Sequence, residues 1–302
     1  MKKEIKLVGV SCPLCGAKNN CQVIFRSNFS LADFNKDIYS ARRLPDRIHY
    51  QLVKCLSDGL VRSTPVLAKP ALLDLYRQSF FNYEDETQEL TQSYLKVLKK
   101  VLEKLPETAK ILEVGCGNGF LLKELQKMGF KNVFGVEVSQ DAVKKADQTM
   151  AKNIFTEDLV TSHYFKNGTL DFIFLFQTFD HLTDPSEFLQ KVYQLLKKGG
   201  YFLTLNHNFE GISVKLFGEK SPIVDIEHTF YFTPRTLKLL VEKQKFKVLE
   251  CFSPTRIIAF RKLFRFLPLP SQVKKIIVES KKPFLDRTIE LKLGNLCLIA
   301  RK

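Results

Sequence analysis

The chain has 302 residues, 45% of them hydrophobic, and its 47 lysines and arginines outnumber its 32 aspartates and glutamates. This length suits one large domain plus a small one, and no apolar run approaches the about 18 to 20 residues of a membrane span. The formal charge of +15 favours anionic neighbours such as phosphorylated substrates, nucleic acid or an acidic membrane face. The first residues carry too short an apolar run for a signal peptide, so we predict a cytoplasmic protein with reduced thiols.

Cysteines stand out in the first section of the chain, residues 1–68. Cys12 and Cys15 form a C-x-x-C-G knuckle, and Cys21 follows at a less typical distance. Cys55 lies in a second segment, with Asp58 three residues later. Two thiolates at the first spacing can bind one metal ion, whereas a redox C-x-x-C belongs at a strand-to-helix turn.

Residues 69–105 show apolar side chains at helical spacing, and Pro106 ends the pattern. From Ala109 onward strands alternate with helices, which is typical of a parallel sheet covered on both faces. The predicted strands are 109–114, 131–136, 153–156, 170–176, 201–205, 247–252 and 295–300. The predicted helices of this part are 120–128, 141–150, 185–197 and 234–243.

The pattern predicts an α/β fold: a Rossmann-like, seven-stranded, mostly parallel sheet with helices on both faces, preceded by a small N-terminal module. We predict three units, namely residues 1–68 as that module, 69–105 as a helical connector and 106–302 as the Rossmann-like domain.

A glycine-rich loop follows the first predicted strand. Glu113-x-Gly115-x-Gly117-x-Gly119 stands between a buried strand and a helix, which brings backbone N–H groups close to a ligand. A dinucleotide fingerprint requires its third glycine one residue later, where this chain has Phe120. Glu137 ends the next strand, 22 residues after Gly115, where a carboxylate can accept both ribose hydroxyls.

The E-x-G-x-G-x-G loop resembles motif I of the class I S-adenosylmethionine-dependent methyltransferases. Segments 177–185, 195–202 and 227–233 are similar to later parts of that family in order and spacing, with Asp180 in place of a usual glutamate. Segment 227–233 and the cysteine segments are similar to a subgroup with an N-terminal zinc-binding module. Asp58 stands where that module has its fourth cysteine.

The resemblance implies S-adenosylmethionine as the cofactor and zinc as a structural ion. The residues implied to bind the cofactor lie in the glycine loop and after the second, third and fourth strands: Glu113, Gly115, Cys116, Gly117, Asn118, Gly119, Glu137, Val138, Asp158, Leu159 and Gln177. The implied zinc ligands are Cys12, Cys15, Cys55 and Asp58. Cys21 as the fourth ligand, and a module held by packing without metal, are the alternatives. Matching tyrosines of similar enzymes cover the cofactor, which makes Tyr76, Phe80 and Tyr83 candidates for a lid.

Methyl transfer to a hydroxyl needs alignment and a base, which a histidine can supply. His181 follows the fourth strand and His228 lies in a segment expected to wall the substrate side, so both are candidates, with His228 slightly ahead. The leading interpretation is methylation of oxygen or carbon on a small molecule: a sugar, a lipid precursor or a secondary metabolite.

Two other functions compete with this interpretation. A zinc module and a basic chain also allow RNA methylation, but residues 1–68 have no basic stripe interleaved with aromatics. A degenerate, non-catalytic binding module is the third possibility, against which the intact Glu113, glycines and Glu137 argue.

The long connection 253–292 includes a basic and apolar segment. Residues 256–270 contain no acid, and four lysines follow by residue 282. A helix over 256–270 would suit an anionic membrane interface, with 256–282 making a peripheral membrane contact and serving an anionic or lipid-linked acceptor. The preferred interpretation is that its phenylalanines pack on the sheet or cap the substrate pocket.

Overall fold

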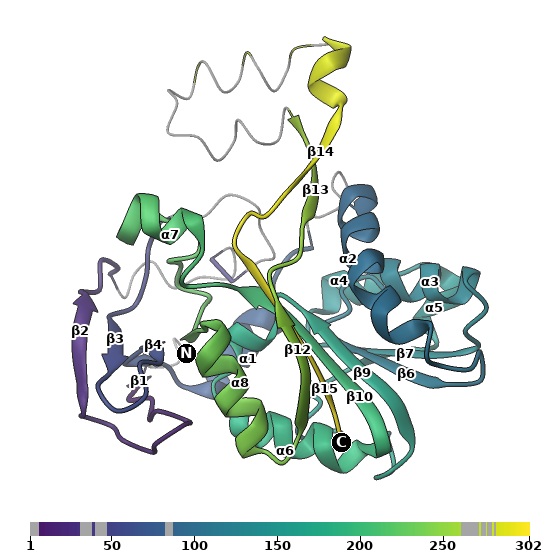
Figure 1. Cartoon of the computed structure of the whole chain (residues 1–302), viewed down its shortest axis with the longest axis horizontal. Coiled ribbons are helices and arrows are strands. Elements are labelled where there is room, and N and C mark those ends of the chain that lie inside the picture. The colour runs from purple at the N-terminus through teal and green to yellow at the C-terminus, as the bar shows by residue number, and fades with distance from the viewer. Residues whose placement is uncertain are drawn as a thin grey trace.

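The computed structural model describes residues 6–30, 38–39, 47–81, 87–260, 272, 276, 280 and 282–302. Its centre is a seven-stranded sheet with the order β12-β15-β10-β9-β6-β7-β8 (Figure 1). The strands of this sheet are β6 (Lys110–Val114), β7 (Asn132–Glu137), β8 (Ile154–Thr156), β9 (Leu170–Phe176), β10 (Leu196–His207), β12 (Lys247–Phe252) and β15 (Asn295–Arg301). Only β15 runs antiparallel to its neighbours in this sheet. The predicted Rossmann-like, mostly parallel sheet is confirmed.

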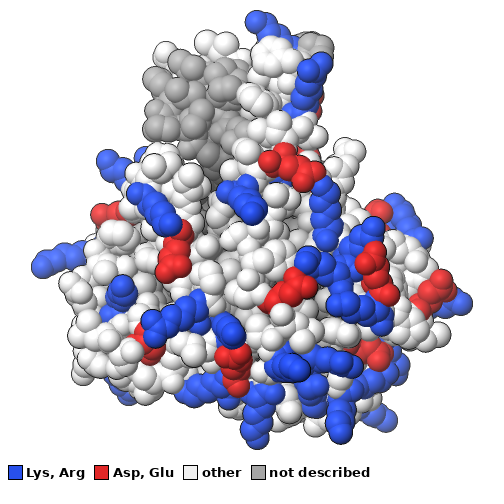
Figure 2. All heavy atoms as spheres, in the orientation of Figure 1, with Lys and Arg blue, Asp and Glu red and all other residues white. Residues whose placement is uncertain are grey.

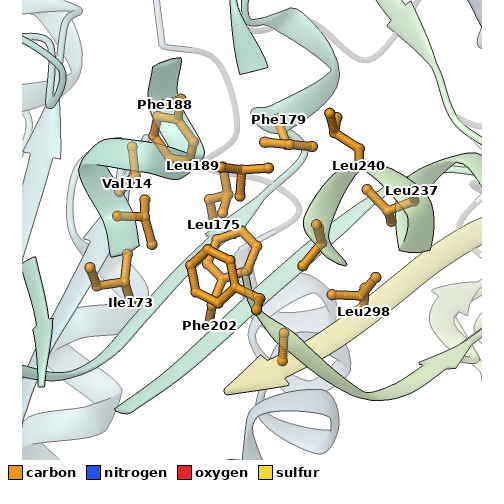
Figure 3. Close-up of a cluster of buried hydrophobic side chains, with 14 of the residues drawn as sticks. Val114, Ile173, Leu175, Phe179, Phe188, Leu189, Phe202, Leu237, Leu240 and Leu298 are labelled. Atoms are coloured by element: carbon orange, nitrogen blue, oxygen red, sulfur yellow. The ribbon is translucent and has the colours of Figure 1, made fainter. Parts of the chain in front are cut away.

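Strand β9 shows why the sheet needs cover on both faces. Its side chains alternate between the faces, so Ile173 and Leu175 enter one core and Phe172, Phe174 and Phe176 the other. Helices α6 (Pro185–Leu195) and α8 (Pro234–Lys243) cover the first face (Figure 3). Helices α2 (Thr87–Leu102) and α3 (Phe120–Lys127) cover the second.

The prediction of one continuous helix over residues 141–150 is wrong. The structure has two short helices instead, α4 (Gln140–Lys144) and α5 (Gln148–Ala151). Asp147 separates them because its carboxylate accepts the Thr149 N–H and begins a new helix.

The predicted boundary between helix 185–197 and strand 201–205 is also wrong. Helix α6 ends at Leu195, and β10 begins at once with Leu196 beside Leu170 of β9. The register then shifts before Tyr201, with Gly199 at φ +81°. The glycine pair therefore forms an irregularity inside a strand rather than the end of a helix.

The N-terminal residues form a second sheet that recruits a strand from far along the chain. Its order is β11-β4-β3-β2, and β11 (Phe230–Tyr231) pairs with β4 (Val61–Ser63). The other strands of this region are β2 (Cys21–Phe25), β3 (Leu52–Cys55), and the separate pair β1 (Leu7–Val8) and β5 (Val66–Leu67). Helix α1 (Lys69–Arg77) and α2 then form the expected helical connector. The unit boundaries at residues 68 and 105 stay predictions.

Two elements extend from the end of the sheet where β10 ends. Helix α7 (Ile212–Phe217) follows β10, and β13 (Arg256–Ala259) pairs with β14 (Thr288–Leu291) in an arm that projects from the molecule (Figure 1). The helix considered over 256–270 is wrong for 256–259, which are a strand because they pair with β14; 261–270 lie outside the described residues. Short 3-10 turns are η3 (Phe179–His181), η4 (Gly218–Lys220) and η5 (Pro283–Asp286). No helix among the described residues is long and apolar enough to cross a membrane.

Candidate functional site

A cleft of about 280 Å³ lies at the carboxyl ends of β6, β7 and β9. The glycine loop after β6 forms one wall, and side chains of α1 together with Phe80 and Phe81 form another. Ligands of open α/β sheets bind at this edge, so the cleft occupies the expected place. Tyr76 and Phe80, considered above as a lid, line the cleft, whereas Tyr83 lies outside the described residues.

The glycine loop adopts backbone conformations that favour glycine. Gly115, Gly117 and Gly119 have φ angles of +71°, +57° and +74°. A β carbon on Gly115 would lie 2.5 Å from Thr178 Oγ1, and one on Gly117 would lie 2.7 Å from the Phe81 ring. A side chain at either position would therefore collide with Thr178 or Phe81, which also line the cleft.

Two buried carboxylates flank the loop. Glu113 is 4% exposed, and its Oε2 has no hydrogen-bond partner among the described residues. Burial, together with the charge of Glu137, raises the pKa of Glu113 well above its ordinary value. Glu137 accepts the Gly117 N–H at 2.9 Å and the Ser139 N–H at 2.8 Å, although burial still raises its pKa. A cationic ligand group in the cleft would satisfy Glu113 and restore its charge.

Asp158, implied by the resemblance to bind the cofactor, lines the cleft together with its neighbour Glu157. Asp158 accepts the Val160 N–H and lies 3.4 Å from Lys69 Nζ, while Glu157 Oε1 is buried without a hydrogen bond in the described structure. Leu159 contributes to the same wall.

The remaining predicted cofactor residues divide into two groups. Val138, Cys116 and Gln177 line the cleft, whereas Asn118 and Gly119 do not. Gln177 has φ +50°, and its Oε1 is buried without a hydrogen bond in the described part of the chain. Such a conformation in a non-glycine residue is costly and concentrates at ligand sites.

Three histidines surround one buried carboxylate beside the cleft. Asp180 is 2% exposed and accepts a hydrogen bond from His207 Nδ1 at 3.0 Å. Asp180 Oδ1 lies 3.8 Å from His181 Nε2, and Asp180 Oδ2 lies 3.8 Å from His228 Nε2. His181 lines the cleft and makes a 3.0 Å hydrogen bond with the Tyr76 hydroxyl through Nδ1. His228 does not line the cleft.

The hydrogen bonds of this cluster indicate where its protons lie. His228 Nδ1 lies 2.8 Å from the Ile223 carbonyl, which can only accept, so that nitrogen carries the proton. Burial lowers the pKa of His181 to about 3, against the attraction of Asp180, and also lowers the pKa of His228. Burial opposes ionisation of Asp180 as well, but the His207 hydrogen bond and the adjacent imidazoles hold its pKa well below the usual range. At neutral pH the Asp180 carboxylate therefore lies beside two neutral imidazoles, those of His181 and His228.

A separate group of sulfur and oxygen atoms lies in the N-terminal sheet. The ligand atoms of Cys12, Cys15, Cys55 and Asp58 all lie within 4.8 Å of one another. Asp58 Oδ2 is 3.1 Å from Cys12 Sγ and 3.2 Å from Cys55 Sγ, and the Cys15 and Cys55 sulfurs are 3.4 Å apart. Cys21 pairs with Cys55 across the sheet but is outside this group, because its sulfur faces the Lys18 carbonyl. Three thiolates and a carboxylate are a donor set that zinc accepts.

Sequence reasoning missed two contacts of the histidine cluster. It named His181 and His228 as candidates but not His207, and it treated Asp180 only as a replacement, yet Asp180 and His207 are hydrogen bonded. The available signal was that polar side chains follow Phe176 at the end of β9 and that β10 ends in His207, and neighbouring parallel strands end at one edge. No local pattern signalled that Tyr76 of α1 meets His181.

A family model described as a methyltransferase domain matches residues 86–251. An uncharacterized methyltransferase of Geobacillus sp. (strain WCH70) is 34% identical over 129 residues, covering 42% of this chain and 59% of its own length. A ubiquinone biosynthesis O-methyltransferase of Vibrio parahaemolyticus is 25% identical over 178 residues, covering 54% of this chain and 75% of its own.

Among solved structures, one described as a complex between the Haloferax volcanii Trm112 methyltransferase activator and the putative methyltransferase shares the fold, with TM-score 0.50 and 17% identity over 72% of this chain and 94% of that one. The matched residues 86–251 make up more than half of the chain, which therefore belongs to the methyltransferase domain family.

Proposed function

We propose that the enzyme methylates a hydroxyl oxygen of a small-molecule acceptor, and that His181 receives the hydroxyl proton. The observation that carries this proposal is the neutral His181 on the cleft wall, hydrogen bonded to Tyr76 and backed by the buried Asp180. A lipid precursor is the acceptor class we favour, because several relatives are named ubiquinone biosynthesis O-methyltransferases. Carbon methylation of a sugar or secondary metabolite is the alternative within the same class of small acceptors.

S-adenosylmethionine supplies a methyl group on a sulfonium, which needs no further activation. The residues of the cleft fit this cofactor. The Glu113 carboxylate, whose Oε2 has no hydrogen bond in the described structure, suits the ammonium group of the cofactor, and the glycine loop leaves room for its methionine portion. Glu137 is suited to the ribose hydroxyls, and Asp158 with Leu159 to the adenine. Gln177 Oε1 can accept a further hydrogen bond from a ligand.

The acceptor side consists of α1 and η3. We assign the proton of neutral His181 to Nε2, which faces the unpaired oxygen of Asp180, and this leaves the Nδ1 lone pair toward Tyr76 and the cleft. A proton leaving the acceptor hydroxyl moves to Nδ1, directly or through the Tyr76 hydroxyl. Asp180 then stabilises the imidazolium that forms. His228 is fixed by its hydrogen bond to the Ile223 carbonyl and lies 3.8 Å from Asp180, so we assign it a positioning role.

We also propose that Cys12, Cys15, Cys55 and Asp58 hold one structural zinc ion. Support comes from the mutual distances of their ligand atoms and from the small size of the sheet that they join. Removing the ion would leave three thiols and a carboxylate in contact without a counter-charge.

The test is a calorimetric titration with S-adenosylmethionine followed by a transfer assay. Glu113→Gln should weaken cofactor affinity by about 10- to 100-fold, because a charge-assisted hydrogen bond is lost. Glu124→Gln, on the exposed face of α3, is the matched control and should leave affinity unchanged. Equal affinity in both variants would refute the assignment of Glu113.

For the acceptor, labelled methyl groups from the cofactor should appear in a phenol- and lipid-containing small-molecule fraction. Label in RNA would support the RNA alternative, and cofactor binding without label in any fraction would support a binding module.

A further inference from the structure

Asp180, His181 and His228 direct three possible metal-ligand atoms at one another. One such atom from each residue lies within 4.8 Å of the other two. The distances of 3.8 Å from Asp180 Oδ1 to His181 Nε2 and from Asp180 Oδ2 to His228 Nε2 are too long for hydrogen bonds. Nitrogen and oxygen ligands lie about 2.0 to 2.2 Å from a zinc ion, and therefore roughly 3 to 4 Å from one another. The spacing of these atoms suits an ion between them.

The atoms that face this gap have no other partner. Asp180 is 2% exposed, and its Oδ1 has no hydrogen bond in the part of the chain that the structure describes. The same holds for the Nε2 atoms of His181 and His228, whose hydrogen bonds are made through Nδ1. Because His228 Nδ1 carries the proton, the Nε2 of the neutral ring directs a lone pair toward the carboxylate.

No lysine or arginine among the described residues compensates the charge of Asp180. Figure 2 shows lysines and arginines on the surface of the molecule, whereas the ion-pair contacts of Asp180 are with His181, His207 and His228. A buried carboxylate without a cationic partner is costly. A cation bound in the gap would offset this cost.

Both imidazoles are anchored on the side away from the gap. His228 Nδ1 lies 2.8 Å from the Ile223 carbonyl, and His181 Nδ1 lies 3.0 Å from the Tyr76 hydroxyl. Histidines that ligate a metal generally donate their other ring N–H to an oxygen in this way, which fixes the orientation of the ring. Two imidazoles and a carboxylate are ligands that zinc accepts. His181 lines the cleft, which gives an ion a route to the site.

We propose that Asp180, His181 and His228 bind a zinc ion reversibly and that the ion stops methyl transfer. The ion forms a bond to His181 Nε2, which gives up its proton, while Nδ1 takes up a proton and donates it to the Tyr76 hydroxyl. His181 then has no lone pair for the proton of the acceptor. The loss of activity rests on the proposed function, whereas the binding of the ion does not.

The test is a calorimetric titration of the untagged full chain with zinc chloride, without cofactor or acceptor. Thiolates bind zinc more tightly than this donor set, so the cysteine group fills first. Wild type should bind about one zinc ion per chain more than His228→Asn or His181→Asn. His163→Asn is the matched control and should bind like wild type, since His163 is exposed and outside the cluster. Equal melting temperatures would show that the variants are folded.

A transfer assay measures the consequence for activity. Saturating zinc should lower the kcat of wild type and of His163→Asn by about 100-fold, because a general base contributes at least that factor. Removal of the added zinc by gel filtration should restore the rate. His228→Asn should keep its own zinc-free rate when zinc is added.

Two results would overturn the site. Wild type could bind no more zinc than His228→Asn, or the additional ion could be lost in His163→Asn, which would place it on the surface. If wild type binds the additional ion and kcat is unchanged, the site stands but the inhibition and the role of His181 as the base are refuted. Failure of the site and failure of the proposed function are thereby told apart.

Discussion

Gly117 shows how a single missing side chain shapes the cofactor site. Gly117→Ala should weaken S-adenosylmethionine binding by about tenfold or more, because the new β carbon would displace Phe81 at 2.7 Å and stand in the cleft. Calorimetry measures the affinity. Gly168→Ala is a matched control, since Gly168 has a similar φ of +68° but nothing within 4 Å. Both substitutions carry a backbone cost of about 1 kcal/mol, so equal loss of affinity would contradict a specific role for Gly117.

His181 gives a pH-dependent signature of its burial. The pKa of His181 is about 3 in the folded protein, below the ordinary value of 6.5. At a pH below 6.5 the unfolded chain therefore binds the proton more tightly than the folded protein does. The stability that neutral His181 provides is present above pH 6.5 and is lost as the pH falls toward 3. Wild type should therefore lose stability relative to His181→Asn between about pH 7 and 4. Urea unfolding at several pH values measures this difference, and a constant difference would show that His181 is not desolvated.

At the scale of elements, β4 connects the cysteine group to the histidine cluster. The Ser63 N–H and hydroxyl donate to the carbonyls of Thr229 and His228, both at 2.8 Å. The Thr229 N–H donates in turn to the Asp180 carbonyl at 2.9 Å. The backbone around His228 is therefore held between the N-terminal sheet and η3, so a change in that sheet can reach the acceptor side.

Zinc removal should accordingly affect turnover as well as stability. Native protein should contain about one zinc per chain by elemental analysis, and Cys15→Ser should lose the metal and melt at a lower temperature. Its kcat should fall while its affinity for S-adenosylmethionine stays near that of wild type, because the glycine loop does not touch the N-terminal sheet's ligand group. Cys21→Ser, outside the group, should retain metal and activity. Native protein without zinc and with an unchanged melting temperature would support the metal-free alternative.

At the scale of the whole molecule, cofactor binding should stabilise the fold. A ligand at 100 times its Kd that binds only the folded state adds about 2.7 kcal/mol, which raises the melting temperature by several degrees. S-adenosylmethionine should produce this shift in a thermal melt and NAD should not, since Phe120 replaces the third glycine of the dinucleotide fingerprint. Equal shifts with both ligands would contradict the cofactor assignment.

The sheet was predictable because its signals are local. The run Leu170–Phe176 is apolar except for Asp171, which only a strand covered on both faces tolerates, and the positive φ angles of the loop require glycines that the sequence displays. Errors arose where a single side chain changed the outcome. Asp147 began a new helix inside an otherwise helical pattern, and pairing with β9 carried β10 back to Leu196. Secondary-structure propensity averaged over a window of residues does not detect either effect.

The sequence by itself determined the class of fold, the position of the glycine loop and the two carboxylates beside it. Only the tertiary structure brought His207 and His228 to Asp180, joined Tyr76 to His181 and paired Phe230 with Arg62. The physical reason is the distance along the sequence over which each interaction acts. A strand or a glycine turn depends on neighbours within a few residues, whereas these contacts depend on the order of strands in two sheets, which is set by how all the apolar faces are buried together.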